Sequence, residues 1–434
     1  MPESPALKAW LDRIEAQHPA EIELGLARVA AVAGRMGLLP APLPVVVIGG
    51  TNGKGSTLAF LEAALTAAGH TVGAYTSPHL FRFNERVRLA GLEAADDALI
   101  AAFHRVEAAR EGTPLTYFEF ATLAAMAVFA EQADIALLEV GLGGRLDAVN
   151  IWEPTVAVVT SVALDHQAFL GADREAIGFE KAGIFRSGVP AVCGDPDPPR
   201  SVLAGGGDDL RCIGRDFALT DAGGEVWWRG DGQAVGPLPA TGAPYQARNA
   251  ATAIAAGQCL PAGLAPRSEH WRTALAGVRL PGRAQRMAGE PPVWLDVAHN
   301  PAAATELARL LAKEPVPGET YAVFGAMHDK DVEGIRAAMA PVVNRWYPCG
   351  VSGDRGLSGE ALCARLPAAP LAEGAPFADA ASALEAARRA ARPGRDRIVV
   401  LGSFLMVAAV LEAAGPETGA SAPMGIAEGE GGHD

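Results

Sequence analysis

The sequence predicts an α/β protein: an N-terminal, mainly parallel sheet with helices on both faces, followed by a smaller α/β domain. Short apolar runs, at 42–50 and 133–144 among others, end in glycine or polar residues, as buried strands of a parallel sheet do. Alanine-rich segments with helical spacing, such as 56–69 and 117–132, alternate with these runs. In such sheets ligands bind beyond the carboxyl ends of the strands, where this sequence places polar residues.

The alternation of strands and helices is interrupted once and then resumes. Residues 195–246 are rich in Gly, Pro and Asp and contain only short β-like pieces such as 225–230. Pro and Gly at 277–287 suit a domain boundary, and strand-loop-helix segments begin again at 291. We therefore expect a first domain over residues 1–280, a second over 281–415, and a disordered tail over 416–434, which is poor in bulky apolar groups.

Composition and charge exclude several classes of partner. The chain has 434 residues, half of them apolar, and a formal net charge of −14 that no basic run offsets. This argues against nucleic acid and anionic membranes, while local cations can still bind a small anion. The start of the sequence lacks the features of a signal peptide, and no apolar run is long enough for a membrane span. We expect a cytoplasmic monomer, without a disulfide framework or a thiolate metal site because the five cysteines are widely spread.

Residues 48–57, "IGGTNGKGST", resemble a phosphate-binding loop between a strand and a helix. The sequence departs from the consensus motif G-x-x-x-x-G-K-[ST], because Ile48 replaces the first glycine and Gly55 follows Lys54. The glycines let backbone N–H groups turn inward, Lys54 supplies a mobile cation, and the helix N-terminus adds positive potential. The alternative is an ordinary glycine-rich turn. We expect a triphosphate site, which makes the first domain P-loop-like.

Three further polar residues fall at predicted strand ends. Ser77, Glu139 and His166 together offer a hydroxyl, a carboxylate and an imidazole, which could hold a divalent cation beside the phosphates. Each also has a structural alternative: Ser77 precedes Pro78 and could cap a helix, Glu139 could form a salt bridge, and a lone histidine is usually structural. Imidazole is a soft ligand for Mg²⁺, so Mn²⁺ stays open as the metal.

Four other residues could take part in chemistry. Lys181 stands in "IGFEKAGIF", where the alternative is a surface lysine whose stem covers apolar residues. Asp296 and His299 stand in "LDVAHNP", at a strand end before a helix that His299 or Asn300 could simply cap. Arg283, in "LPGR", could be only a charge at the hinge between the domains.

Taken together, ten motifs in order across nearly the whole chain resemble the Mur ligase superfamily, and within it the bacterial bifunctional dihydrofolate synthases/folylpolyglutamate synthases. The irregular phosphate loop has the form used by that superfamily. The resemblance implies a Rossmann-like second domain. The motifs are "GTNGKGST", "TSPHL", "LTYFEFATL", "EVGLGGRLDAVN", "VTSVALDH", "FEKAGIFR", "LPGR", "DVAHNP", "MHDKD" and "GSF".

The resemblance implies ATP-dependent amide formation, in which the γ-phosphate passes to a carboxylate and the amine of L-glutamate then displaces phosphate. The acceptors would be dihydropteroate and reduced folates, with ATP and Mg²⁺ as cosubstrate and metal. Lys181 would be the carbamylated lysine of the family, a modification that arginine cannot carry.

The resemblance also assigns roles to residues by position. Lys54, Lys181 and His166 would be catalytic, and Ser77, Glu139 and His166 would hold the metal. ATP would be bound by Thr51, Asn52, Gly53, Lys54, Gly55, Ser56, Asn249, Arg283 and Asp296. The pterin would contact Glu23, Leu24, Gly25, Leu26, Leu115, Thr116, Tyr117, Phe118, Leu146, Asp147 and Ala148. Candidates for the glutamate side are His299, Asn300 and Ser403.

Alternatives remain open from the sequence. A monofunctional dihydrofolate synthase or folylpolyglutamate synthase would carry the same motifs. A cell-wall Mur ligase shares the chemistry, but "TSPHL", "LTYFEF" and the lack of a separate N-terminal UDP-binding domain argue against it. A regulatory nucleotide-binding module without catalysis is disfavoured because every ATP and metal motif is kept. The number of glutamates added and the preferred folate cannot be predicted.

Overall fold

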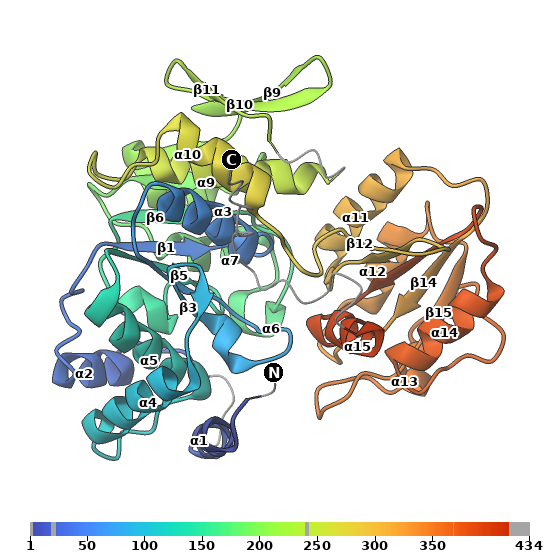
Figure 1. Cartoon of the computed structure of the whole chain (residues 1–434), viewed down its shortest axis with the longest axis horizontal. Helices are drawn as coiled ribbons and strands as arrows, with labels where there is room; N and C mark the ends of the chain where they lie inside the picture. The colour runs from blue at the N-terminus through green and yellow to red at the C-terminus, as the bar shows by residue number, and fades with distance from the viewer. Residues whose placement is uncertain (1–2, 19–22, 239–242, 368, 416–434) are drawn as a thin grey trace, which may run out of the picture.

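A computed structural model describes residues 3–18, 23–238, 243–367 and 369–415 (Figure 1). The expected disordered tail, 416–434, lies outside these residues. The chain forms two lobes, each built around its own sheet (Figure 1). This arrangement confirms the predicted fold class.

The larger sheet has eight strands in the order β4-β3-β2-β5-β1-β6-β7-β8. The six strands from β2 to β8 along this order pair in parallel, as predicted, whereas β3 and β4 add an antiparallel edge that the sequence analysis did not anticipate. The strands are β1 (Val45–Gly49), β2 (Val72–Tyr75), β3 (Val87–Leu89), β4 (Leu92–Glu93), β5 (Ile135–Glu139), β6 (Val156–Val159), β7 (Ala191–Cys193) and β8 (Leu210–Cys212).

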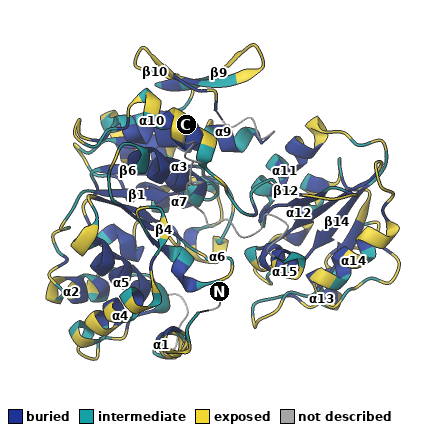
Figure 2. Cartoon of the chain, viewed as in Figure 1, coloured by how far each residue is buried: buried dark blue, intermediate teal, exposed yellow. Residues whose placement is uncertain are grey.

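Helices cover both faces of this sheet because alternate strand residues point to opposite sides. In β1, Val45 and Val47 belong to one core, and Val46 and Ile48 belong to the other. All four are fully buried, as are most strand residues in Figure 2. The first core includes residues of α1 (Pro5–Ala16), α2 (Ala27–Arg35), α4 (Asp96–Arg110), α5 (Tyr117–Gln132), α7 (Arg174–Ala182) and α8 (Arg200–Gly206). The second includes residues of α3 (Lys54–Ala67), α9 (Pro244–Gln258) and α10 (Ser268–Gly277).

Short helical turns fill the connections of the first lobe. They are η1 (Phe83–Arg86), η2 (Ala148–Ile151), α6 (Gln167–Leu170) and η3 (Gly207–Asp209). The glycine-rich region after residue 195 contains β8 and then a separate antiparallel sheet, in the order β11-β10-β9, that lies above α9 and α10 in Figure 1. Its strands are β9 (Phe217–Ala222), β10 (Glu225–Gly230) and β11 (Gln233–Val235), and β10 coincides with the predicted β-like piece. Trp228 of β10 is fully buried, which fastens this sheet to the second core.

The second lobe has a five-stranded sheet in the order β12-β13-β16-β14-β15, antiparallel only at β12. Its strands are β12 (Gln285–Met287), β13 (Val293–Leu295), β14 (Thr320–Phe324), β15 (Arg345–Pro348) and β16 (Arg397–Leu401). Helices of this lobe are α11 (Pro301–Lys313), α12 (Val332–Met339), α13 (Gly359–Ala364), α14 (Ala380–Ala390) and α15 (Phe404–Ala414). The first three pack on one face of the sheet, and α14 and α15 pack on the other.

The two sheets support the proposed division into residues 1–280 and 281–415, which stays a prediction. No helix in the described part of the chain has the length and apolar character needed to cross a membrane. At the carboxyl end of the large sheet, β1 leads into the phosphate loop and β6 into the loop with His166, whereas β5 ends at Glu139 and β2 is followed by Ser77. These ends face the second lobe (Figure 1).

Candidate active site

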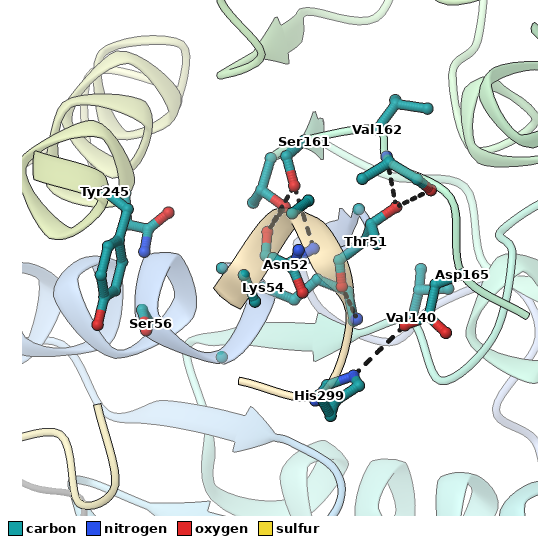
Figure 3. Close-up of a pocket in the computed structure, with 18 of the residues that line it drawn as sticks. Thr51, Asn52, Lys54, Ser56, Val140, Ser161, Val162, Asp165, Tyr245 and His299 are labelled. Atoms are coloured by element: carbon teal, nitrogen blue, oxygen red, sulfur yellow. Dashed lines mark hydrogen bonds and ion pairs between the residues drawn. The ribbon is translucent and has the colours of Figure 1, made fainter. Parts of the chain in front are cut away.

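A cavity of about 390 Å³ lies where the two lobes meet. Figure 3 shows its lining residues converging from the phosphate loop, the loop after β6, α9 and the second lobe. The cavity therefore brings together segments that are far apart in the sequence. Among the predicted residues it is lined by Thr51, Asn52, Gly53, Lys54, Gly55, Ser56, Ser77, Glu139, His166, Lys181, Asn249, Arg283, Asp296 and His299.

The phosphate loop is shaped by two glycines with positive φ. Gly53 immediately precedes α3 with φ of +89°, and a Cβ there would lie 2.3 Å from the Asn249 side-chain oxygen. Gly50 has φ of +143°, and a Cβ there would lie 1.9 Å from Oγ1 of Thr160. A residue with a side chain would fit neither this backbone conformation nor the space available at these two positions. The loop therefore presents bare backbone at the start of α3, as a phosphate site requires.

The loop is held in place by the segment that follows β6. The Thr51 N–H donates to the Ser161 carbonyl at 2.7 Å, and its hydroxyl accepts the Ala163 N–H at 3.0 Å. The Asn52 carbonyl accepts the hydroxyls of Thr160 and Ser161 at 2.8 and 3.0 Å. These contacts of Thr51, Asn52 and Ser161 are visible in Figure 3. These hydrogen bonds engage the polar groups on the outer side of the phosphate loop and hold the loop against the segment after β6.

Among the described residues, the charged groups of three cations in the cavity wall have no anionic partner within hydrogen-bonding or ion-pair distance. In this part of the chain, the Lys54 amine donates only to the Thr51 carbonyl, at 3.3 Å. The Lys181 amine makes neither a hydrogen bond nor an ion pair with a described residue, and the Arg283 guanidinium stacks on Phe404, 4.9 Å from the ring centre. Burial and the charge of Lys54 lower the pKa of Lys181 to about 7. Burial also lowers the pKa of Arg283. Positive groups left unpaired in this way are suited to a polyanionic ligand.

Lys181 is not the surface lysine that the sequence left open as an alternative. Its side chain is 3% exposed and faces the cavity from α7. Because its pKa is close to 7, a large fraction of the amine is neutral near neutral pH, and a neutral amine is a nucleophile. This is the protonation state that carbamate formation needs.

Glu139 is a buried carboxylate at the end of β5. Burial raises its pKa, which the charges of Lys54 and Arg283 oppose. One oxygen accepts the Ser77 N–H at 3.1 Å, its sole hydrogen bond with a described residue. The predicted alternatives are wrong for this pair, because Glu139 forms no ion pair within 4.0 Å in the described chain and no helix begins at Ser77.

His166 and Asp165 follow β6 on the same loop. Burial lowers the pKa of His166 to about 4, and although Asp165 opposes this shift, Lys330 adds to it. The imidazole is therefore neutral at physiological pH, as a metal ligand must be. Burial opposes ionisation of Asp165, but its hydrogen bond with His299 and the nearby charges of His299 and Lys330 hold its pKa well below the usual range.

The donor set fits a hard divalent cation. Glu139 has unused acceptor positions, His166 is neutral, and Ser77 lies beside Glu139. Among the described residues, no group of three or more His, Cys, Asp or Glu side chains is arranged to hold a metal, and the predicted set contains only two such residues. The remaining ligands of a bound cation would thus be hydroxyl, phosphate and water oxygens, which Mg²⁺ accepts.

Asp296 organises the second-lobe side of the cavity. Its carboxylate accepts the Tyr245 hydroxyl at 2.7 Å and the backbone N–H groups of Ala284 and Ala298, each at 2.9 Å. Burial raises the pKa of Asp296, and the charge of Arg283 opposes this. Tyr245 was not predicted, because a tyrosine at the start of a helix carries no sequence signal of its own.

Contacts between the lobes concentrate at the cavity. Asn52 and Asn300 exchange two side-chain hydrogen bonds, at 3.1 and 3.0 Å. Asp165 accepts from Asn300 at 3.0 Å and pairs with Lys330 at 2.8 Å and with His299 at 3.4 Å. Figure 3 shows the contact between His299 and Asp165. Asn300 also caps α11, as the alternative interpretation expected.

The other glutamate-side candidate lies deeper in the second lobe. Ser403 caps α15 through the Met406 N–H, is buried, and does not line the cavity, although the next residue, Phe404, does. Residues that line the cavity without having been predicted include Asp165, Arg174, Asp195, Tyr245, Arg248 and Glu306. Asp165 had one available signal, since it directly precedes His166 in the motif.

The three predicted pterin segments lie together beside the cavity. The Gly25 N–H donates to the Leu146 carbonyl at 3.3 Å, and Thr116 caps α5 through a reciprocal pair with Glu119. A Cβ at Gly141, in the cavity wall, would lie 2.7 Å from the Phe118 ring. None of the predicted pterin residues lines the cavity itself. Burial raises the pKa of Asp147 to about 6, with three backbone N–H groups opposing the shift.

Comparison with known proteins agrees with the geometry. Residues 48–194 match the Mur ligase middle domain, and residues 282–404 match the glutamate ligase domain of Mur ligases. The Escherichia coli K12 dihydrofolate synthase/folylpolyglutamate synthase is 44% identical over 416 residues, which cover 94% of this chain and 95% of that protein. The Haemophilus influenzae protein of the same name is 40% identical over 384 residues, covering 83% and 86%.

The chain belongs to the dihydrofolate synthase/folylpolyglutamate synthase family of Mur ligases. Solved structures of this family share its fold. E. coli FolC in complex with DHPP and ADP has a TM-score of 0.88 and 42% identity, covering 95% of this chain and 99% of that one. A bifunctional folylpolyglutamate synthase/dihydrofolate synthase with Mn, AMPPNP and L-glutamate bound has a TM-score of 0.85 and 41% identity, with the same coverage.

Proposed function

We propose that this chain joins L-glutamate to dihydropteroate and to the glutamate tail of reduced folates, with ATP driving the reaction through an acyl phosphate. Family membership supports the reaction class. The observation that carries the proposal is the cavity between the lobes, in which Lys54, Lys181 and Arg283 have no anionic partner among the described residues at hydrogen-bonding or ion-pair distance. Such a site suits a reaction that brings several anions together.

In the proposed mechanism, the phosphate loop and Lys54 bind the phosphates of ATP. Backbone N–H groups at the start of α3 face the phosphates, and Asn249, Arg283 and Asp296 complete the nucleotide site from the other side. The acceptor carboxylate must approach the γ-phosphate, and the two anions repel each other. Lys54 and the helix N-terminus offset that repulsion more strongly in a buried site than in water.

Ser77, Glu139 and His166 would hold Mg²⁺ or Mn²⁺. The cation supplies charge neutralisation for the phosphates. Glu139 is suited to this because it is buried with spare acceptor capacity, and His166 because its imidazole is neutral.

We propose that Lys181 is carbamylated. The lowered pKa leaves the amine neutral and nucleophilic near pH 7, and its attack on CO₂ would release one proton and leave a carbamate anion. That change would relieve the repulsion between Lys181 and Lys54. The new carboxylate would help to orient the metal ligands around it.

Water must be kept from the acyl phosphate, and the position of the cavity supports this. The pairs between Asn52 and Asn300 and between Asp165 and Lys330 hold the second lobe against the loop. The second lobe thus forms one wall of the reaction space. His299 remains a candidate for the glutamate side, and Asn300 and Ser403 are weaker ones because neither lines the cavity.

The assay that tests this proposal measures ADP release in the presence of Mg²⁺ and L-glutamate. Dihydropteroate and tetrahydrofolate are compared as acceptors, each with and without glutamate. ADP release that depends on glutamate with both acceptors supports the bifunctional enzyme, and release with one supports a monofunctional one. Release with neither acceptor contradicts the proposal. Cytoplasmic location and a monomeric state stay predictions, to be tested by fractionation and by light scattering.

A further inference from the structure

Arg86 is a cation that has no carboxylate partner among the described residues and lies outside the cavity wall. Its Nε donates to Nδ1 of His79 at 2.8 Å, and its guanidinium lies 5.7 Å from the Phe83 ring centre and 5.3 Å from that of Tyr117. Among the described residues it forms no ion pair. The two rings and the histidine fix the orientation of the guanidinium, and its terminal nitrogens make no hydrogen bond with a described residue.

The residues around Arg86 do not neutralise its charge. Nδ1 of His79 accepts the hydrogen bond from Nε of Arg86 and therefore carries no proton, so the ring is a neutral acceptor. The Glu3 carboxylate accepts the Phe83 N–H at 2.7 Å and does not pair with Arg86. An oriented arginine of this kind is the residue type that binds carboxylates through two parallel hydrogen bonds.

Arg86 is connected to the cavity on two sides. His79 follows Ser77 and Pro78, both of which line the cavity. Tyr117 precedes Phe118, whose ring lies against Gly141 of the cavity wall. Arg86 thus contacts Tyr117 of the segment proposed to bind the pterin, and it contacts His79, which follows a segment that lines the cavity.

We propose that Arg86 binds a carboxylate of the acceptor that the reaction does not activate. The proposal rests on the proposed function. Dihydropteroate has one carboxylate, which is the one activated. An acceptor that already carries glutamate has two, so one stays ionised and unreacted beside the site. Arg86 would therefore distinguish glutamylated acceptors from dihydropteroate.

The test compares KM and kcat for dihydropteroate and tetrahydrofolate in Arg86→Gln, Arg86→Lys and a control. Arg86→Gln should raise KM for tetrahydrofolate by about ten-fold or more, the usual effect of losing a charge-assisted hydrogen bond, with dihydropteroate changed by less than about two-fold. For Arg86→Lys, we expect a KM for tetrahydrofolate between those of the unaltered protein and Arg86→Gln. The control, Arg13→Gln, removes a cation that stacks on Trp10 at 5.0 Å in α1 and should change neither acceptor.

Two results would overturn the inference: equal KM changes for both acceptors, or no change for either. Calorimetric titration of each acceptor in the presence of ADP gives the same comparison without turnover, so a poorly active variant remains informative. If the unaltered protein releases no ADP with either acceptor, the proposed function fails, and the titration still decides whether Arg86 selects the second carboxylate.

Discussion

The central feature at the residue scale is the set of cations that the fold leaves uncompensated. A buried charge without a partner is costly, and the pKa values of Lys181 and Arg283 are lowered by burial for that reason. Other buried arginines have partners: Arg88 pairs with Glu62 at 2.7 Å, and Arg397 donates to the Leu311 carbonyl at 2.7 Å. The free-energy cost of these unpaired cations is offset if a polyanionic ligand occupies the cavity during the reaction.

Lys54→Ala should abolish ATP use. The substitution removes the mobile cation at the phosphate loop, and loss of one such group lowers turnover by at least about 100-fold in comparable sites. The measurement is glutamate-dependent ADP release. Lys313→Ala, which removes an exposed lysine at the end of α11, should behave as the unaltered protein does. Near-normal release in Lys54→Ala would show that the loop does not hold the reacting phosphate.

Lys181→Arg should lower activity by more than about ten-fold although the charge is kept, because arginine forms no carbamate. Lys313→Arg is the control for the same exchange at an exposed site. Full activity of Lys181→Arg would refute the carbamate, and electron density at Lys181 would test it directly.

The carbamate also predicts a pH dependence. Because burial lowers the pKa of the Lys181 amine to about 7, the amine is protonated below that pH and about 90% neutral one unit above it. At a fixed concentration of dissolved CO₂, activity of the native protein should therefore rise as the pH increases through 7. The proposal would be contradicted if activity falls over this pH interval, or if activity does not change when CO₂ is removed.

At the scale of elements, the sequence predicted the strands and helices whose patterns are local. Helix α5 has the predicted bounds, and β1 and β5 lie within the predicted apolar runs 42–50 and 133–144. The antiparallel edge of β3 and β4 was missed because these strands have three and two residues, too few for periodicity. Edge strand β12 was interpreted only as part of a domain boundary, since its Pro and Gly neighbours dominate the local pattern.

Gly53→Ala tests the phosphate loop as an element. Both Gly53 (φ +89°) and Gly69 (φ +93°) adopt a conformation that costs other residues about 1 kcal/mol, but only at Gly53 would a Cβ collide, with Asn249. Gly69→Ala is therefore the matched control, because nothing lies within 4 Å of its Cβ. We expect similar small losses of unfolding free energy but a much weaker affinity for ATP in Gly53→Ala alone. Equal ATP affinities, measured by calorimetry, would contradict this account.

At the scale of the whole molecule, the site depends on contacts that the sequence does not reveal. Asn52 and Asn300 are 248 residues apart, and Asp165 and Lys330 are 165 apart. Motif resemblance indicated most of the residues that line the cavity. It did not indicate which side chains pair across the lobes, because pairing follows from how the two sheets are docked. The sequence analysis therefore assigned no role to Tyr245 or Lys330.

Lys330→Met should loosen the two lobes. Lys330 is buried between Asp165 at 2.8 Å and Asp329 at 3.3 Å, so its loss leaves the Asp165 carboxylate with fewer partners. We expect kcat/KM to fall by at least about ten-fold and the radius of gyration from small-angle scattering to increase. Lys313→Met serves as the control. An unchanged radius of gyration with unchanged activity would show that this pair does not hold the lobes together.

The central claim is that ATP phosphorylates the acceptor carboxylate in this cavity, and transfer of an oxygen isotope tests it most directly. Dihydropteroate labelled with ¹⁸O in its carboxylate is incubated with the protein, ATP, Mg²⁺ and L-glutamate, and the released phosphate is examined by mass spectrometry. An acyl phosphate requires one carboxylate oxygen to leave with the phosphate. The account therefore predicts one ¹⁸O atom per phosphate, and phosphate released without label during amide formation would contradict it.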